Sequence, residues 1–309
     1  MKKVICLIIV SSLIFLLSGC AVTGNSFGDK RIKVVASVYP VYEFAQAIGG
    51  DKINLSLLAP PGAEPHDWEP SAKDLVKIRE AGLFLYQGNG FEPWVDKMLT
   101  QNKTTSSVAV SHDIETLSGI GEDDEEDLDA AGKPVLTIDP HIWLDPVLAV
   151  QEANNICEAL VSVDPANEAI YRKNLESLTL QLTALDQEYA QAVQKFERKD
   201  FVTTHAAFGY LAKRYGLHQV PLMGLAPDAE PTPEKLAQVS KFCREHKVKA
   251  VFFETLVSPK LANMLGKETG AAVLVLNPIE GLTEKETKAG NNYFSVMQEN
   301  LKNLKVALQ

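Results

Sequence analysis

Short apolar runs alternate with helical patterns along most of the chain. In the first half, strands are expected at 32–38, 53–59, 83–86, 107–110 and 135–138, and helices at 42–48, 72–81, 93–99 and 146–161. After residue 199 the alternation returns, with strands expected at 201–203, 219–223, 250–254 and 272–276 and helices at 206–215, 233–246, 259–269 and 293–308. Alternation of this kind predicts parallel sheets covered by helices.

One helical pattern between these two series is longer than the others. Apolar residues recur at steps of three and four from Leu175 to Phe196, which gives one continuous stripe. Asp164 is a suitable N-cap and Pro165 a suitable first residue, so we expect a helix over 165–199, about 50 Å long at about 1.5 Å per residue. A coiled-coil seam between protomers is the alternative use of the stripe, but it is short for that purpose, which favours a monomer.

The sequence therefore predicts an α/β protein of two lobes. Residues 31–163 and 200–309 would each form a mostly parallel sheet flanked by helices, and one long rigid helix at 164–199 would join them. A helical connector of this kind should limit hinge closure.

The first residues are typical of a bacterial lipoprotein leader. Met1-Lys2-Lys3 is basic, residues 4–17 are apolar but too few to span a bilayer, and Leu17-Ser18-Gly19-Cys20 resembles a lipobox. We expect 1–19 to be a signal peptide, Cys20 to carry the lipid (palmitate among its fatty acids) and 20–30 to be a flexible tether. The chain would then be extracytoplasmic and anchored to the bacterial cell membrane. An ordinary secretory leader with an incidental cysteine is the alternative.

Composition narrows the choice of partners. The chain has 309 residues, 46% of them apolar, and a formal net charge of −10. An acidic chain is a poor ligand for nucleic acid or anionic lipid, so membrane contact is expected only through the N-terminal lipid, whereas a cationic solute is compatible. The acidic run at 122–129 should be a surface loop, used either for weak cation capture or for solvation alone. Cys157 and Cys243 fall in helical patterns of different lobes, and we expect two buried free thiols.

Four residues carry the candidate chemistry. His66 and His141 each lie in a proline-bracketed loop after a strand-like run, His205 follows the run at 201–203, and Glu280 follows the run at 272–276. Their spacing suits a site assembled from the carboxyl ends of separate strands, where open α/β sheets bind ligands. Three imidazoles and one carboxylate form a four-coordinate set that suits a borderline-soft divalent ion, zinc in particular. Two of these ligands would come from each lobe.

The carboxylates that flank these positions are candidates for a supporting role. A carboxylate that accepts a hydrogen bond from an imidazole N–H fixes the tautomer of a metal-binding histidine. The flanking acids are Glu64, Asp67, Glu69, Asp139 and Asp145, and spacing does not select among them.

The four segments resemble, in order and separation, those of the cluster A-I solute-binding lipoproteins that serve bacterial ABC importers of zinc and manganese. The resemblance extends over nearly all of the chain after the leader. It implies two α/β lobes joined by a rigid helix, capture of a metal outside the cell membrane and delivery to an ABC transporter permease. Three histidines with a carboxylate are typical of the zinc members, so His66, His141, His205 and Glu280 imply zinc rather than manganese.

Other functions are weighed against this one. A zinc hydrolase would need an open coordination position, and the sequence has no HExxH, GxSxG or Gly-rich phosphate loop, so we expect no enzyme. A manganese-binding homologue and a surface adhesin with a structural zinc site remain alternatives.

Overall fold

The computed structural model describes residues 30–101, 105–118, 138–227 and 231–309. The predicted signal peptide, Cys20, most of the tether and the acidic run at 122–129 lie outside these residues. The part from Arg31 to Gln309 is one compact unit. No helix in the described ranges is long and apolar enough to cross a membrane.

The sheet of the N-terminal lobe contains four parallel strands in the order β2-β1-β3-β4. Its strands are β1 (Ile32–Ala36), β2 (Ile53–Leu57), β3 (Leu83–Tyr86) and β4 (Ser106–Ala109), and its helices are α2 (Tyr39–Gly49), α3 (Ala72–Glu80), α4 (Pro93–Gln101) and α5 (Pro146–Val163). Alternate residues of β1 face opposite layers: Val34 packs in the cluster that includes α2 and α5, whereas Val35 packs with residues of α3 and α4.

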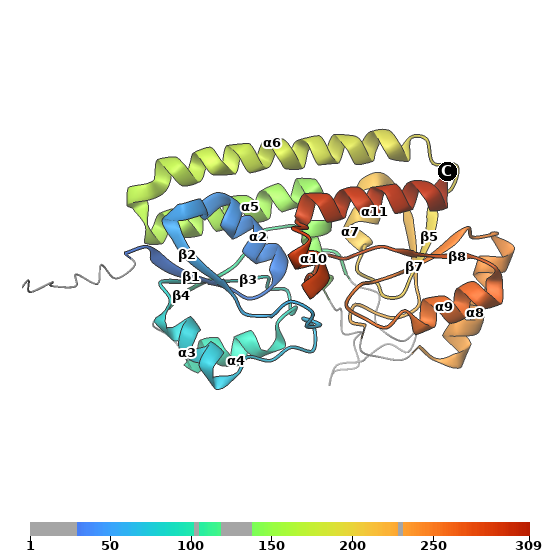
Figure 1. Cartoon of the computed structure of the whole chain (residues 1–309), viewed down its shortest axis with the longest axis horizontal. Helices are drawn as coiled ribbons and strands as arrows, with labels where there is room; N and C mark the ends of the chain where they lie inside the picture. Colours follow the sequence, from blue (N-terminus) through green and yellow to red (C-terminus); the bar gives the residue numbers. More distant parts are fainter. Residues whose placement is uncertain (1–29, 102–104, 119–137, 228–230) are drawn as a thin grey trace, which may run out of the picture. The chain divides into compact units, whose positions relative to one another are not determined.

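The C-terminal lobe repeats this plan with the strand order β6-β5-β7-β8, again parallel. Figure 1 shows the two lobes side by side. Its strands are β5 (Asp200–Thr203), β6 (His218–Pro221), β7 (Ala250–Phe253) and β8 (Ala272–Val275), and its helices are α7 (Gly209–Tyr215), α8 (Pro233–Glu245), α9 (Lys260–Thr269), α10 (Glu284–Lys288) and α11 (Tyr293–Leu308). The predicted class, two parallel α/β lobes flanked by helices, is confirmed.

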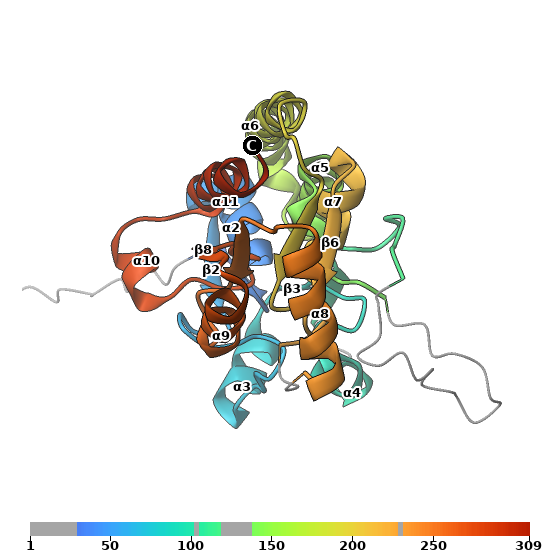
Figure 2. The same ribbon diagram turned by 90° about the vertical axis from the view of Figure 1, so that its right-hand side faces the viewer.

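The connecting helix α6 spans Glu168–Val193 and packs against helices of both lobes: α2, α5, α7 and α11. Figure 2 shows it nearly end-on, on the side opposite α3, α4, α8 and α9. Its predicted ends were wrong. Pro165–Asn167 form a 3₁₀ turn, and Asp164 does not cap the helix because its carboxylate accepts hydrogen bonds from Asn167 and Tyr171 (2.7 and 2.6 Å).

Smaller differences concern other predicted elements. The expected strand at 135–138 is described only at Ile138, which forms an isolated antiparallel bridge with Ser118. The helix expected from residue 206 begins at Gly209, and the short helix α10 was not predicted. Cys157 and Cys243 are buried free thiols, as expected.

Candidate metal centre

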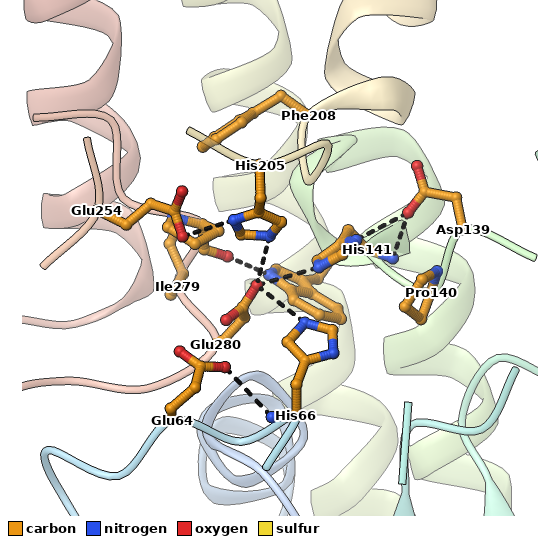
Figure 3. A network of polar contacts seen from close by, with 12 residues as sticks. Glu64, His66, Asp139, Pro140, His141, His205, Phe208, Glu254, Ile279 and Glu280 are labelled. Carbon is orange, nitrogen blue, oxygen red and sulfur yellow. Dashed lines mark hydrogen bonds and ion pairs between the residues drawn. The ribbon is translucent and has the colours of Figure 1, made fainter. Parts of the chain in front are cut away.

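The four predicted side chains meet at one point between the lobes (Figure 3). One potential ligand atom from each of His66, His141, His205 and Glu280 lies within 4.8 Å of the others. Glu280 Oε1 is 3.0 Å from Nε2 of His141, 3.3 Å from that of His205 and 3.5 Å from that of His66. Ligand atoms about 2.1 Å from a tetrahedral zinc ion lie about 3.4 Å from one another. The three separations from Glu280 Oε1 are therefore close to the edges of such a tetrahedron.

The carboxyl ends of parallel strands position three of the four candidate ligands, as the spacing predicted. His141 differs, because Ile138 before it forms only an isolated bridge with Ser118 and belongs to neither sheet. His66 lies in the loop after β2, His205 follows β5 and Glu280 follows β8. The carbonyl oxygen of His205 accepts hydrogen bonds from Thr203 Oγ1 (2.7 Å) and Gln219 Nε2 (2.8 Å). These bonds hold His205 in a loop, so α7 begins later than the helical pattern suggested.

Glu280 is aimed by an unusual backbone turn. The preceding residue, Ile279, is fully buried and has a φ of 61°, a conformation that a β-branched residue adopts only under strain. Asn277 supports the turn, because its side-chain oxygen accepts the Ile279 N–H at 2.8 Å. Asn277 is itself held by Asn300, which accepts its N–H and donates to its carbonyl oxygen (2.8 and 2.7 Å).

Carboxylates orient two of the imidazoles. Asp139 Oδ1 accepts from the backbone N–H of His141 at 2.9 Å and lies 2.8 Å from its Nδ1, which leaves Nε2 to face the cluster. Asp139 is thus the flanking acid in the supporting role. Glu64 instead accepts the backbone N–H of His66 (3.2 Å), and Asp145 accepts N–H groups at the start of α5.

The acid that supports His205 was missed by the sequence analysis. Glu254 Oε2 lies 2.6 Å from His205 Nδ1, and the hydroxyl of Thr204 donates to the other carboxylate oxygen. Glu254 directly follows β7. The sequence analysis placed Glu254 inside the strand expected at 250–254, so it was not considered as a residue that follows a strand.

Burial and charge act against each other at the centre. The side chains of His141, His205 and Glu280 are at most 1% exposed and that of His66 is 10% exposed. Burial disfavours the charged imidazole of His205, but Glu254 and then Glu280 outweigh it and raise its pKa well above the ordinary value. Burial likewise opposes ionisation of Glu280, but the three imidazoles hold its pKa well below the ordinary value. The pKa of Glu64 is raised to about 8 by burial and by the charge of Glu280.

The protein's own hydrogen bonds leave part of the cluster unsatisfied. The buried Nε2 atoms of His66 and His205 have no hydrogen-bond partner within the described residues. Buried polar atoms normally have partners, so two imidazole nitrogens directed at one carboxylate oxygen indicate a position for a cation. The donor set and its geometry fit zinc.

Two α/β lobes, each with a parallel sheet, share a buried cluster of potential ligand atoms. This arrangement defines a two-lobed solute-binding protein. The chain belongs to the family described as zinc-uptake complex component A, periplasmic (ZnuA), whose model matches residues 34–307. The family consists of solute-binding transport proteins and is not an enzyme family.

Similar proteins agree with this assignment. The chain is 40% identical over 315 residues to the high-affinity zinc uptake system protein ZnuA of Bacillus subtilis, a match that covers 99% of this chain and 98% of the relative. It is 41% identical over 308 residues to the zinc-binding lipoprotein AdcA of Streptococcus pneumoniae. This match covers 99% of this chain but only 61% of the length of the relative. The crystal structure of the Zn(II)-bound ZnuA-like domain of that AdcA superposes with a TM-score of 0.77 at 39% identity, covering 90% of this chain and 99% of that domain.

Proposed function

We propose that this chain captures Zn²⁺ outside the cytoplasmic membrane and delivers it to the membrane permease of an ABC importer. The observation that carries the proposal is the convergence of His66, His141, His205 and Glu280 on one buried point. The names of the similar proteins support it, because they describe zinc uptake and zinc binding.

The donor set favours zinc over manganese. Imidazole nitrogens suit zinc, whereas manganese prefers sites with more oxygen ligands. The cluster offers three nitrogens and the carboxylate of Glu280. Glu64 and Glu254 are engaged with the backbone of His66 and the ring of His205, which leaves the nitrogen-rich set to face the ion.

The same arrangement favours binding over catalysis. A catalytic zinc ion normally has three protein ligands and an open position for water or substrate. Here four side chains from two lobes surround the position and at least nine-tenths of each is buried. Capture followed by release is therefore the chemistry that the site supports.

Titration calorimetry with Zn²⁺ and Mn²⁺ on chelator-treated protein tests the assignment. We expect tight 1:1 zinc binding and weaker manganese binding. His66→Ala, His141→Ala and His205→Ala should each weaken zinc binding strongly, because each removes one of four ligands. His218→Ala is the matched control, since this imidazole pairs with Asp200 at the surface (2.8 Å). Wild-type affinity in all three ligand variants would refute the site, and manganese binding at least as tight as zinc would refute the choice of metal.

We further propose that the mature chain is a monomer tethered by a lipid on Cys20. The lipobox-like segment Leu17-Ser18-Gly19-Cys20 supports the tether. Cys20→Ser should move the protein from the membrane fraction to the soluble extracytoplasmic fraction without changing its zinc affinity. Equal membrane association of the wild type and the variant would contradict lipid attachment at this residue. Light scattering tests the oligomeric state, and the mass of a dimer would contradict the proposed monomer.

A further inference from the structure

Helix α7 of the C-terminal lobe contacts both ends of the segment that carries His141. Tyr210 and Arg214 are four residues apart, so they share one face of the helix. The hydroxyl of Tyr210 donates to the backbone carbonyl oxygen of Asp139 (2.8 Å) and accepts the N–H of Leu117 (3.0 Å). Arg214 Nε lies 2.9 and 2.8 Å from the two carboxylate oxygens of Asp145. Residues 139–145 are thus held from the opposite lobe on both sides of His141.

A third contact involves the first residue of α7. A Cβ atom added to Gly209 would lie 2.6 Å from Oδ2 of Asp139, well inside contact distance. The other oxygen of the same carboxylate is the one that orients His141, at 2.8 Å from Nδ1. Gly209 therefore leaves the space that this carboxylate needs in order to hold the imidazole.

We propose that the face of α7 formed by Gly209, Tyr210 and Arg214 positions His141 from the opposite lobe and thereby sets how fast zinc leaves the site. The proposal rests on the function proposed above. Helix α7 starts four residues after His205, so one short rigid element relates the two histidines. The three residues contact Asp139 and Asp145, and they act through these carboxylates as positioning residues.

The segment has other supports that should keep it folded when α7 is altered. Trp143 Nε1 donates to the carbonyl oxygen of Pro278 (2.7 Å), and the Tyr293 hydroxyl donates to the carbonyl oxygen of Trp143 (2.6 Å). These contacts hold the middle of the segment. Changes on α7 should therefore shift Asp139 and Asp145 while the core stays intact.

Lys213 provides a matched control on the same helix. It also pairs with the other lobe, through Glu115 at 3.2 Å, but the two side chains are 59% and 83% exposed. Ion pairs between exposed side chains contribute little to the stability of a fold. The Asp145 side chain is only 5% exposed, so Arg214 pairs with a buried charge.

Gly209→Ala is the sharpest variant. Alanine has the higher helix propensity and the clash falls on the end of a side chain, so the melting temperature of the metal-free protein should not fall. The displaced carboxylate would no longer hold His141. Changes to groups that support a metal ligand typically cost about 10- to 100-fold in metal affinity. We expect zinc to leave Gly209→Ala, Tyr210→Phe and Arg214→Gln about tenfold faster or more, and to leave Lys213→Gln at the wild-type rate.

The experiment measures zinc transfer to a chromogenic chelator by stopped flow, with the Co²⁺ absorption spectrum as a readout of site geometry. Faster release with an altered Co²⁺ spectrum and an unchanged metal-free melting temperature would support the proposal. Wild-type release from Gly209→Ala and Tyr210→Phe would overturn it, even if Arg214→Gln failed to fold. A wild-type chain that bound no zinc would instead overturn the proposed function, and this inference with it.

Discussion

At the scale of single residues, His205 lies between two carboxylates. Glu254 is 2.6 Å from its Nδ1 and Glu280 Oε1 is 3.3 Å from its Nε2. In the metal-free protein this environment raises the pKa of His205 well above the ordinary value despite burial, and the pKa of His141 is also raised. A zinc ion requires neutral imidazoles, so metal and proton compete for the same nitrogens.

Zinc binding should therefore release protons, and affinity should rise with pH. A raised pKa means that the imidazole stays protonated above pH 6.5, so the gain in affinity should continue past the ordinary histidine range. Calorimetry between about pH 6 and 8, in buffers with different ionisation enthalpies, measures the released protons. Heats that do not depend on the buffer near neutral pH would show that His141 and His205 are already neutral.

The four residues that converge at the centre were predictable because their signal is local. Histidines between prolines, or a glutamate just past an apolar run, stand out in the chain. Asp139 was one of five flanking candidates, and only folding shows which carboxylate reaches an imidazole. The strained turn at Ile279 has no local sequence signal, because Asn277, which supports it, is itself held by Asn300 in the last helix.

At the scale of elements, a buried carboxyl links the end of β3 to α5. Glu152 of α5 is fully buried and accepts a hydrogen bond from Gln87 Nε2 at 2.6 Å. Gln87 Nε2 also donates to the carbonyl oxygen of Pro140 at 3.2 Å, next to His141. Gln87 Oε1 is buried and has no partner in the described part of the chain. Burial raises the pKa of Glu152 to about 8.

Glu152→Gln should stabilise the protein increasingly as pH rises. The folded state keeps a proton on Glu152 up to pH about 8, whereas the unfolded chain loses it near pH 4.5, so wild-type stability falls across this window. Glutamine has no proton to lose, so its burial does not become less favourable as the pH rises. Its amide can also donate a hydrogen bond to Gln87 Oε1, which is unpaired within the described residues. The advantage should be on the order of 3 kcal/mol larger at pH 8 than at pH 5. Urea unfolding of the metal-free wild type and variant at both pH values measures the difference in their free energies of unfolding. The same difference at both pH values would show that Glu152 is ionised in the folded protein.

The elements themselves were predicted well where periodicity decides and less well at their ends. The strand at 83–86 and the helix at 293–308 match β3 and α11. The apolar stripe of α6 extends to the buried Phe196, but the helix ends at Val193. Beyond this end, the backbone N–H groups of Glu197 and Arg198 donate hydrogen bonds to the carbonyl oxygen of Leu308. Tertiary contacts of this kind fix the last turn of a helix and leave no local pattern.

At the scale of the whole molecule, α6 helps to join the lobes through one apolar core. A single buried cluster includes Val34 of β1, Leu182 of α6 and Phe252 of β7, and thus reaches both sheets. Helix α6 packs on α2 and α5 of one lobe and on α7 and α11 of the other. A core shared in this way predicts that the lobes unfold together.

The three tryptophans allow a direct test, because Trp68, Trp94 and Trp143 all precede α6. Trp68 and Trp94 pack on each other within the N-terminal lobe, whereas Trp143 also contacts Pro278 of the C-terminal lobe. Tryptophan fluorescence is therefore weighted toward the N-terminal lobe, whereas far-ultraviolet circular dichroism follows the helices of both lobes. In urea, without metal, the two signals should share one midpoint. Leu182→Ala should lower both midpoints together, with a loss of about 2–5 kcal/mol, since Leu182 is fully buried.

Leu180→Ala is the control on the same helix, because Leu180 is 66% exposed and its loss should move neither midpoint. Two separate midpoints in the wild type would mean that each lobe is stable alone. Helix α6 would then act only as a tether, and zinc bound between the lobes would have to supply the coupling that the shared core otherwise provides. One midpoint without metal would mean that the shared core couples the stabilities of the two lobes before any ion is bound.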